Sequence, residues 1–218
     1  MENKKGKNWK EFLSYVFSTL LSLYFPLTAA APSYSIRMER IITIIPIGDI
    51  ESWVLDDLTK RLEATFSCRT KIYKTIPLAQ KAYNPGRNQY YSSHLLQVLH
   101  RHLTPSKHEK VLALVNVDLY VPQLNFVFGE AELGGHFAII SLSRLHQSFY
   151  GLAENKKLFL ERTLKEAVHE LGHTYGLSHC PDATCVMHFS NSLLDTDKKS
   201  ASFCPHCRKL LDEIIGVE

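Results

Sequence analysis

The sequence predicts a single α/β domain with a mostly parallel sheet. Residues 40–46 and 110–117 are nearly continuous apolar runs, which is typical of strands that are covered on both faces, as in parallel sheets. An amphipathic segment at 51–66 lies between them, and it carries an apolar residue at every fourth position from Val54 to Phe66. Strands that alternate with helices indicate right-handed β-α-β crossings, and 218 residues are enough for one domain with a substantial core.

The remaining elements are predicted from hydrophobic periodicity and turn residues. They are strands at 69–76, 126–128 and 136–141 and helices at 92–103, 155–175 and 208–215. The polar residues Asn84-Pro85-Gly86 predict a turn before the second helix. No internal repeat or low-complexity linker interrupts residues 38–218. We therefore expect one domain over 38–218, preceded by an extension at 1–37.

Residues 169–179 carry the chemistry, because they have the pattern H-E-x-x-H-x-x-G-x-x-H without a gap. His169 and His173 are four residues apart, so on a helix their imidazoles project from one face, about 6 Å apart along the axis. Two imidazoles placed in this way can bind one metal ion, and Glu170 beside them is a candidate general base. Gly176 can adopt the left-handed conformation that ends a helix, which lets the chain turn and bring His179 to the same ion.

The expected metal is zinc. Three neutral imidazoles leave one tetrahedral position of Zn²⁺ open, and water bound there has a pKa of about 7. We expect His169, His173 and His179 to bind a catalytic zinc ion, while Glu170 takes a proton from the attacking water and returns it to the leaving amine. The predicted reaction is peptide-bond hydrolysis. The alternative is a zinc-dependent peptide-binding module with little or no turnover, although such a module would not need the general base.

Four of the five cysteines follow this stretch in the order C-x4-C and then C-x2-C. This spacing is typical of a tetrahedral thiolate zinc site with a structural role, so a second zinc ion is expected at Cys180, Cys185, Cys204 and Cys207. Its role would be to brace the loop that carries His179. Two disulfides in an exported domain are the alternative. Cys68 has no partner in the zinc arrangement and is either a buried thiol or a redox-active one.

Together these motifs resemble the archaemetzincin family of zinc metallopeptidases, which belongs to the metzincin clan. The resemblance rests on the histidine pattern followed by C-x4-C-x-M and C-x-x-C, and it extends upstream to the segments 118–122 and 125–131. It implies a metzincin-like peptidase domain: a twisted, mostly parallel sheet with an antiparallel edge strand at the cleft, an active-site helix and a small C-terminal subdomain with cysteines and zinc. It also implies that Met187 lies beneath the catalytic metal.

Residues 1–37 do not resemble part of the domain. A Lys-containing start precedes an uncharged run at 12–36 that includes three alanines at 29–31, which is the pattern of a secretory signal peptide. A membrane anchor is the weaker alternative, because Pro26 and several serines interrupt the run. The third interpretation is an internal translation start at Met38. The protein is expected to be cytoplasmic in that case, and exported or membrane-attached if the segment is a true signal or anchor.

The balance of basic and acidic residues indicates which binding partners the protein can have. Residues 1–40 contain six of the 25 Lys and Arg residues and three of the 22 Asp and Glu residues, so the rest of the chain carries 19 of each. A neutral body lacks the basic surface of a nucleic-acid-binding protein, so we expect a peptide or protein substrate and no nucleic acid. A monomer is expected. Neither the substrate sequence nor a preference for endopeptidase or aminopeptidase cleavage follows from these residues.

Overall fold

The structure, a computed structural model, describes residues 39–216. The segment 1–37, on which the signal, anchor and internal-start interpretations depend, lies outside the described residues. Within residues 39–216, no helix is both long enough and apolar enough to cross a membrane.

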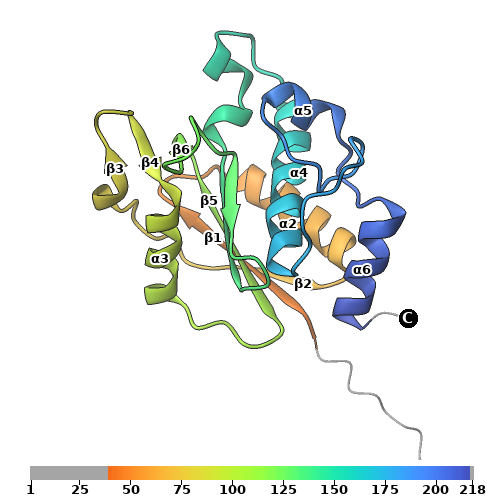
Figure 1. Cartoon of the computed structure of the whole chain (residues 1–218). Helices are drawn as coiled ribbons and strands as arrows, with labels where there is room; N and C mark the ends of the chain where they lie inside the picture. Colours follow the sequence, from red (N-terminus) through yellow and green to blue (C-terminus); the bar gives the residue numbers. More distant parts are fainter. Residues whose placement is uncertain (1–38, 217–218) are drawn as a thin grey trace, which may run out of the picture. The chain divides into compact units, whose positions relative to one another are not determined.

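A five-stranded sheet with the order β2-β1-β5-β8-β7 forms the centre of residues 39–216 (Figure 1). Its strands are β1 (Ile41–Ile47), β2 (Arg69–Ile72), β5 (Glu109–Val115), β8 (Phe137–Ser141) and β7 (Gly129–Ala131). The first four strands are parallel, and β7 runs antiparallel to β8 at the edge of the sheet. The predicted α/β fold with a mostly parallel sheet and an antiparallel edge strand is therefore confirmed.

Helices cover both faces of this sheet. On one face, α2 (Ser52–Phe66) and α4 (Lys156–Thr174) pack in a core that includes Ile44 and Leu112. On the other face, α3 (Ser92–His102) packs in a second core that includes Val111. Alternate side chains of β5 therefore enter different cores, as the pleat of a strand requires.

The edge strand lies three residues later than predicted, at Gly129–Ala131 instead of 126–128. The strand was predicted at 126–128 because those three residues are apolar. In the structure the Val127 N–H donates to the Leu119 carbonyl oxygen at 2.9 Å. This bond ties 126–128 to a second small sheet, which the sequence did not predict, with the strands β3 (Tyr83–Asn84), β4 (Gln89–Tyr91) and β6 (Leu119–Tyr120).

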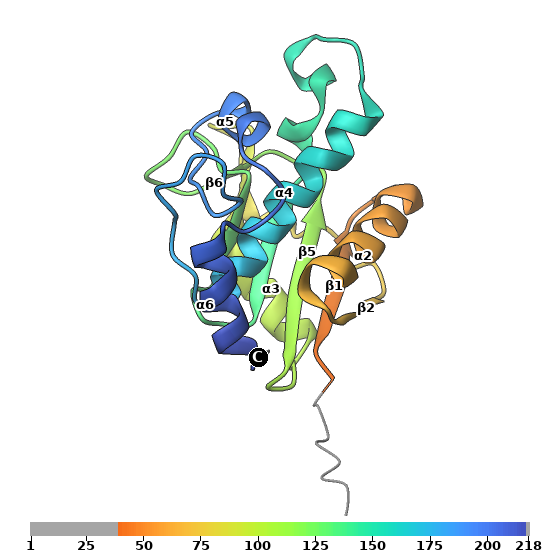
Figure 2. The same cartoon turned by 90° about the vertical axis from the view of Figure 1, so that its right-hand side faces the viewer.

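The C-terminal segment lies beside α4, as Figure 2 shows. It contains α5 (Leu193–Lys198), which the sequence did not predict, and α6 (Pro205–Ile215). Helix α6 begins three residues earlier than predicted, because Cys204 caps it and Pro205 occupies its first turn. The bounds of α4 agree with the prediction to one residue at each end, and the Asn155 side chain accepts a hydrogen bond from the Leu158 N–H at 3.0 Å.

Candidate active site and cysteine cluster

The three motif histidines meet at the C-terminal end of α4. His169 and His173 project from the helix with their Nε2 atoms 3.1 Å apart. The helix ends at Thr174, and Gly176 has a φ of +91°, so the chain turns back where the sequence suggested. This turn brings His179 into the group, in which the potential ligand atoms of the three histidines all lie within 4.8 Å of one another.

The hydrogen bonds of the imidazoles leave their Nε2 atoms free for a metal. His169 Nδ1 donates to the Val186 carbonyl oxygen at 2.8 Å, and His173 Nδ1 donates to the Leu177 carbonyl oxygen at 2.7 Å. A carbonyl oxygen only accepts, so the proton is on Nδ1 and each Nε2 presents a lone pair. Two lone pairs at 3.1 Å repel each other unless a cation lies between them. Tetrahedral zinc with bonds of 2.0–2.1 Å would hold two nitrogens about 3.3 Å apart, so this donor set fits zinc.

The surroundings of the three histidines favour the neutral form that binds metals. Burial lowers the pKa of His169 well below its usual value, and the buried ammonium group of Lys199 lowers it further. The pKa values of His173 and His179 are lowered as well, again chiefly by burial. Imidazoles that resist protonation keep their lone pairs available as ligands.

Glu170 is buried beside the histidines and packs against the edge strand. Its side chain lies so close to Gly129 that a Cβ at position 129 would be 2.6 Å from Glu170 Cγ. Burial raises the pKa of Glu170 well above its usual range, Glu166 raises it further, and Lys199 opposes the shift. A carboxylate with a raised pKa is a stronger proton acceptor, which suits a general base.

Met187 is fully buried next to the turn of α4 that carries His169 and His173. It packs against Gly172, where an added Cβ would collide with Met187 Sδ and lie 3.1 Å from its Cε. Glycine at position 172, between the two helical ligands, therefore makes room for the methionine. The family resemblance implied that Met187 lies beneath the catalytic metal, and this stays a prediction.

Two adjoining pockets open at this group. The first, of about 180 Å³, is lined by Phe126, Phe128 and Phe189 and reaches His169 and Glu170. The second, of about 540 Å³, is wider and also reaches His179. Strand β7 contributes Gly129 to both. The candidate catalytic residues thus lie in an open cleft along the edge of the sheet.

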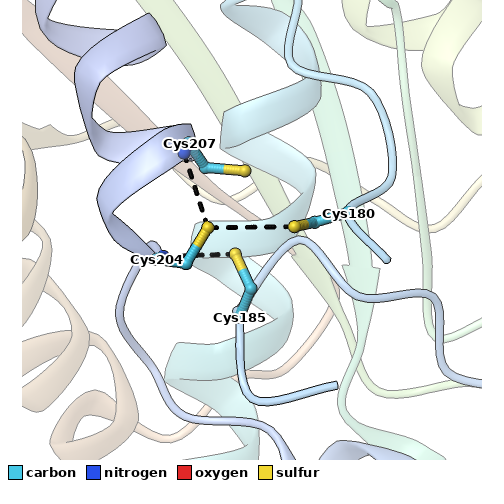
Figure 3. Close-up of side chains that lie close together, drawn as sticks. All are labelled: Cys180, Cys185, Cys204 and Cys207. Carbon is cyan, nitrogen blue, oxygen red and sulfur yellow. Dashed lines mark hydrogen bonds between the residues drawn. The ribbon is translucent and has the colours of Figure 1, made fainter. Parts of the chain in front are cut away.

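The four cysteines that follow the histidine motif form a cluster (Figure 3), and its first member, Cys180, directly follows His179 of the cleft. The Sγ atoms of Cys180, Cys185, Cys204 and Cys207 point toward one another and lie within 4.8 Å, and none forms a disulfide. Cys180 Sγ and Cys204 Sγ are 3.8 Å apart. Tetrahedral zinc with Zn–S bonds of 2.3 Å would hold two sulfurs about 3.8 Å apart, whereas a disulfide bond measures about 2.05 Å. The donor set therefore fits a closed tetrathiolate zinc site.

The two groups share one loop. Cys180 directly follows His179, and the Cys180 N–H donates to the Met187 carbonyl oxygen at 2.9 Å. Cys185 lies two residues before Met187, and its Sγ accepts from the Cys204 N–H at 3.3 Å. The cysteine cluster therefore holds both sides of the loop that carries Met187.

A buried ion pair between Glu166 and Lys199 was not predicted from the sequence. Lys199 Nζ lies 3.1 Å from Glu166 Oε1, and both side chains are almost fully buried. The Thr196 hydroxyl also donates to Glu166 Oε1, at 3.0 Å. Glu166 lies four residues before Glu170, so helical spacing could have placed it on the same face. No local pattern could have identified Lys199 as its partner.

The comparisons with known proteins agree with this geometry. Residues 38–213 match peptidase family M54. The chain belongs to that family. It is 44% identical over 184 residues to the archaemetzincin of Pyrococcus furiosus, and the alignment covers 82% of this chain and 96% of that protein. It is also 44% identical over 172 residues to the archaemetzincin of Methanocaldococcus jannaschii, covering 79% of this chain and 93% of that protein.

Solved archaemetzincin structures share the fold. The crystal structure of the Methanopyrus kandleri protein has a TM-score of 0.71 and 37% identity, over 82% of this chain and 96% of that one. The Archaeoglobus fulgidus protein, crystallised with malonate, has a TM-score of 0.68 and 39% identity, over 78% of this chain and 99% of that one. The family expected from the motifs is confirmed, and this M54 protein is a zinc metallopeptidase.

Proposed function

We propose that His169, His173 and His179 hold a catalytic zinc ion and that Glu170 is the general base of peptide-bond hydrolysis. The observation that carries this proposal is the 3.1 Å approach of two Nε2 atoms, each with its Nδ1 already donating to a carbonyl oxygen. Such an arrangement is stable only around a cation. Glu170 is the buried carboxylate next to it.

The zinc ion and the protein side chains have different roles in the proposed reaction. Zinc supplies Lewis acidity, which polarises the scissile carbonyl group and lowers the pKa of water. Glu170 accepts the proton of the attacking water on a carboxylate oxygen and later gives it to the leaving amine. The contact with Gly129 holds the Glu170 side chain in place, and burial of the carboxylate makes it a stronger base.

The open edge of β7 binds the peptide. One edge of β7 pairs with β8, and because β7 is the terminal strand of the five-stranded sheet, its other edge pairs with no further strand of that sheet. Gly129 of β7 lines the cleft. An extended peptide can add to such an edge through backbone hydrogen bonds, which requires no single sequence. The pocket of about 180 Å³ then accepts one side chain between the rings of Phe126, Phe128 and Phe189.

A second zinc ion, bound by Cys180, Cys185, Cys204 and Cys207, has a structural role. Four thiolates complete a tetrahedral zinc site and leave no position for water or substrate. The same four thiols favour a reducing compartment, where disulfides do not persist, and therefore a cytoplasmic location.

The Glu170→Gln variant tests the proposed function. It keeps the side-chain shape but removes the base, so we expect zinc content to stay the same and turnover of a peptide library to fall by at least about 100-fold. The matched control is Glu213→Gln on α6, where the side chain is exposed, and this variant should keep full turnover. Unchanged turnover in Glu170→Gln would exclude Glu170 as the base. Zinc without turnover in the wild-type protein would favour the peptide-binding module.

A further inference from the structure

A separate cavity of about 650 Å³ lies at the carboxyl ends of the parallel strands. Three of its lining residues lie shortly after the ends of those strands: Asn116 directly follows β5, Ser143 lies two residues after β8, and Glu51 lies four residues after β1. The chain leaves β1 toward β2 and leaves β5 toward β8, on opposite sides. This is a topological switch point, and crevices at such points are where open α/β sheets bind ligands.

The cavity has an aromatic wall. Trp53, His146, Phe149 and Phe159 line it. The His146 ring stacks on the Phe159 ring with centroids 3.9 Å apart, and the Trp53 ring meets Phe159 edge to face at 5.8 Å. Phe159 is buried in the main core, so it fixes the rings of its two neighbours.

The chain's own Lys156 shows which chemical group this wall accepts. Lys156 Nζ lies 3.9 Å from the centroid of the Trp53 ring. A cation over an indole face is attracted by the negative charge of the ring face, and tryptophan gives the strongest such interaction. Lys156 is an exposed residue in the first turn of α4, so its long side chain can leave the ring without disturbing the core.

The rim of the cavity is acidic. Glu51 is exposed at the start of α2, and Glu154 is exposed two residues before α4. Glu154 is held in position because it accepts a hydrogen bond from the Ser148 N–H at 3.1 Å. Two carboxylates thus surround a site whose aromatic wall already binds one ammonium group, so the cavity becomes net negative when Lys156 moves away.

We propose that this cavity binds a lysine side chain of a peptide or protein, whose ammonium group takes the place of Lys156 over Trp53. The aliphatic part of the ligand lies along the exposed ring of Phe149, and Glu51 and Glu154 compensate its charge. Lys156 is an internal competitor that weakens binding. The site is distinct from the peptidase cleft, since Lys156 and His169 are thirteen residues apart on α4 and therefore about 20 Å apart along it.

Fluorescence of Trp53 tests the proposal directly. The chain has two tryptophans, Trp9 and Trp53, so full-length protein with Trp9→Phe reports on Trp53 alone. The probe is N-acetyl-lysine amide, and the control probe is N-acetyl-norleucine amide, which has a similar aliphatic chain but no charge. We expect a saturable change in emission with the lysine probe only. Equal responses to both probes, or no saturable response to the lysine probe, would overturn the proposal.

Variants show whether Lys156 competes with the lysine probe or only changes its affinity through overall charge. Lys156→Met should tighten binding of the lysine probe about fivefold, because it removes the competing cation. The neighbouring Lys157→Met, which alters the charge equally but contacts no ring in this wall, should leave the affinity unchanged. The double variant Glu51→Gln with Glu154→Gln should weaken binding. If Lys156→Met and Lys157→Met changed the affinity for the lysine probe equally, the change would come from overall surface charge and not from competition at Trp53, which would contradict the proposal. Circular dichroism confirms that each variant is folded.

Discussion

Gly129 and Glu170 are in such close contact that a side chain at position 129 has no room: an added Cβ would lie 2.6 Å from Glu170 Cγ and 2.7 Å from the Ile139 carbonyl oxygen. The first contact fixes the candidate base against β7, and the second keeps β7 paired with β8. One glycine therefore links the proposed peptide-binding edge to the candidate general base.

Gly129→Ala is expected to lower peptide turnover about 100-fold while zinc content stays the same. The added methyl group pushes Glu170 away from β7, and a displacement near 1 Å at a reacting group has an effect of this size. The control is Gly86→Ala, where the nearest side-chain atom to the new Cβ would be 3.4 Å away, in ordinary contact. If both variants kept wild-type turnover, the contact would not position Glu170.

Gly172→Ala is expected to destabilise the folded protein by about 1–3 kcal/mol, because its methyl group would overlap the buried Met187 side chain. Chemical denaturation of the zinc-loaded protein measures this change in the free energy of unfolding. The double variant Gly172→Ala with Met187→Leu, which removes the thioether from the contact, should recover part of the loss. An unchanged midpoint in Gly172→Ala would show that Met187 is not packed there.

Cys204→Ser is expected to lose one zinc ion per chain and much of the stability of the C-terminal segment, since structural zinc sites contribute roughly 10–16 kcal/mol of apparent binding free energy. Elemental analysis and thermal unfolding measure the two effects. Cys68→Ala is the matched control, because burial raises the pKa of the Cys68 thiol to about 12 and it lies outside the cluster. Wild-type zinc content in Cys204→Ser would contradict the structural site.

The free energy of unfolding should decrease at acid pH, because Glu109 becomes protonated and loses its stabilising hydrogen bonds. Burial alone would raise the pKa of this carboxyl group, but hydrogen bonds from Lys71, Thr43 and the Ser106 N–H lower it below the ordinary value of 4.5. The unfolded chain therefore binds more protons than the folded chain between these two pKa values. The stabilisation is complete above pH 4.5 and is lost as the pH falls through the folded-state pKa. In denaturation at several pH values, Glu109→Gln should flatten this dependence, and an equally steep dependence would exclude Glu109 as its source.

Local patterns predicted the parts of the structure that depend on nearby residues. The bounds of α4 followed from its apolar spacing, and the convergence of His169, His173 and His179 followed from the turn expected at Gly176. The cysteine spacing likewise anticipated a cluster of four sulfurs. In each case a few residues close in sequence impose the geometry, so no knowledge of distant contacts is required.

Features that depend on distant residues were not predicted. The edge strand β7 is short and only partly buried, so it lacks the apolar signal that drew the prediction to 126–128. The small sheet joins β4 to β6 across 27 intervening residues, from 92 to 118, without any strong periodicity. The pairing of Glu166 with Lys199 joins α4 to the C-terminal segment, and only the folded chain brings these charges together.

The most direct test of the account is the zinc stoichiometry of the purified full-length protein, measured by elemental analysis together with turnover of a random peptide library. We expect two zinc ions per chain, with cleavage that stops when a chelator removes the metal and returns when zinc is restored. One zinc ion per chain together with oxidised cysteines would contradict the structural site. Cleavage that continues after complete removal of zinc would contradict the central claim that the three histidines hold the catalytic metal.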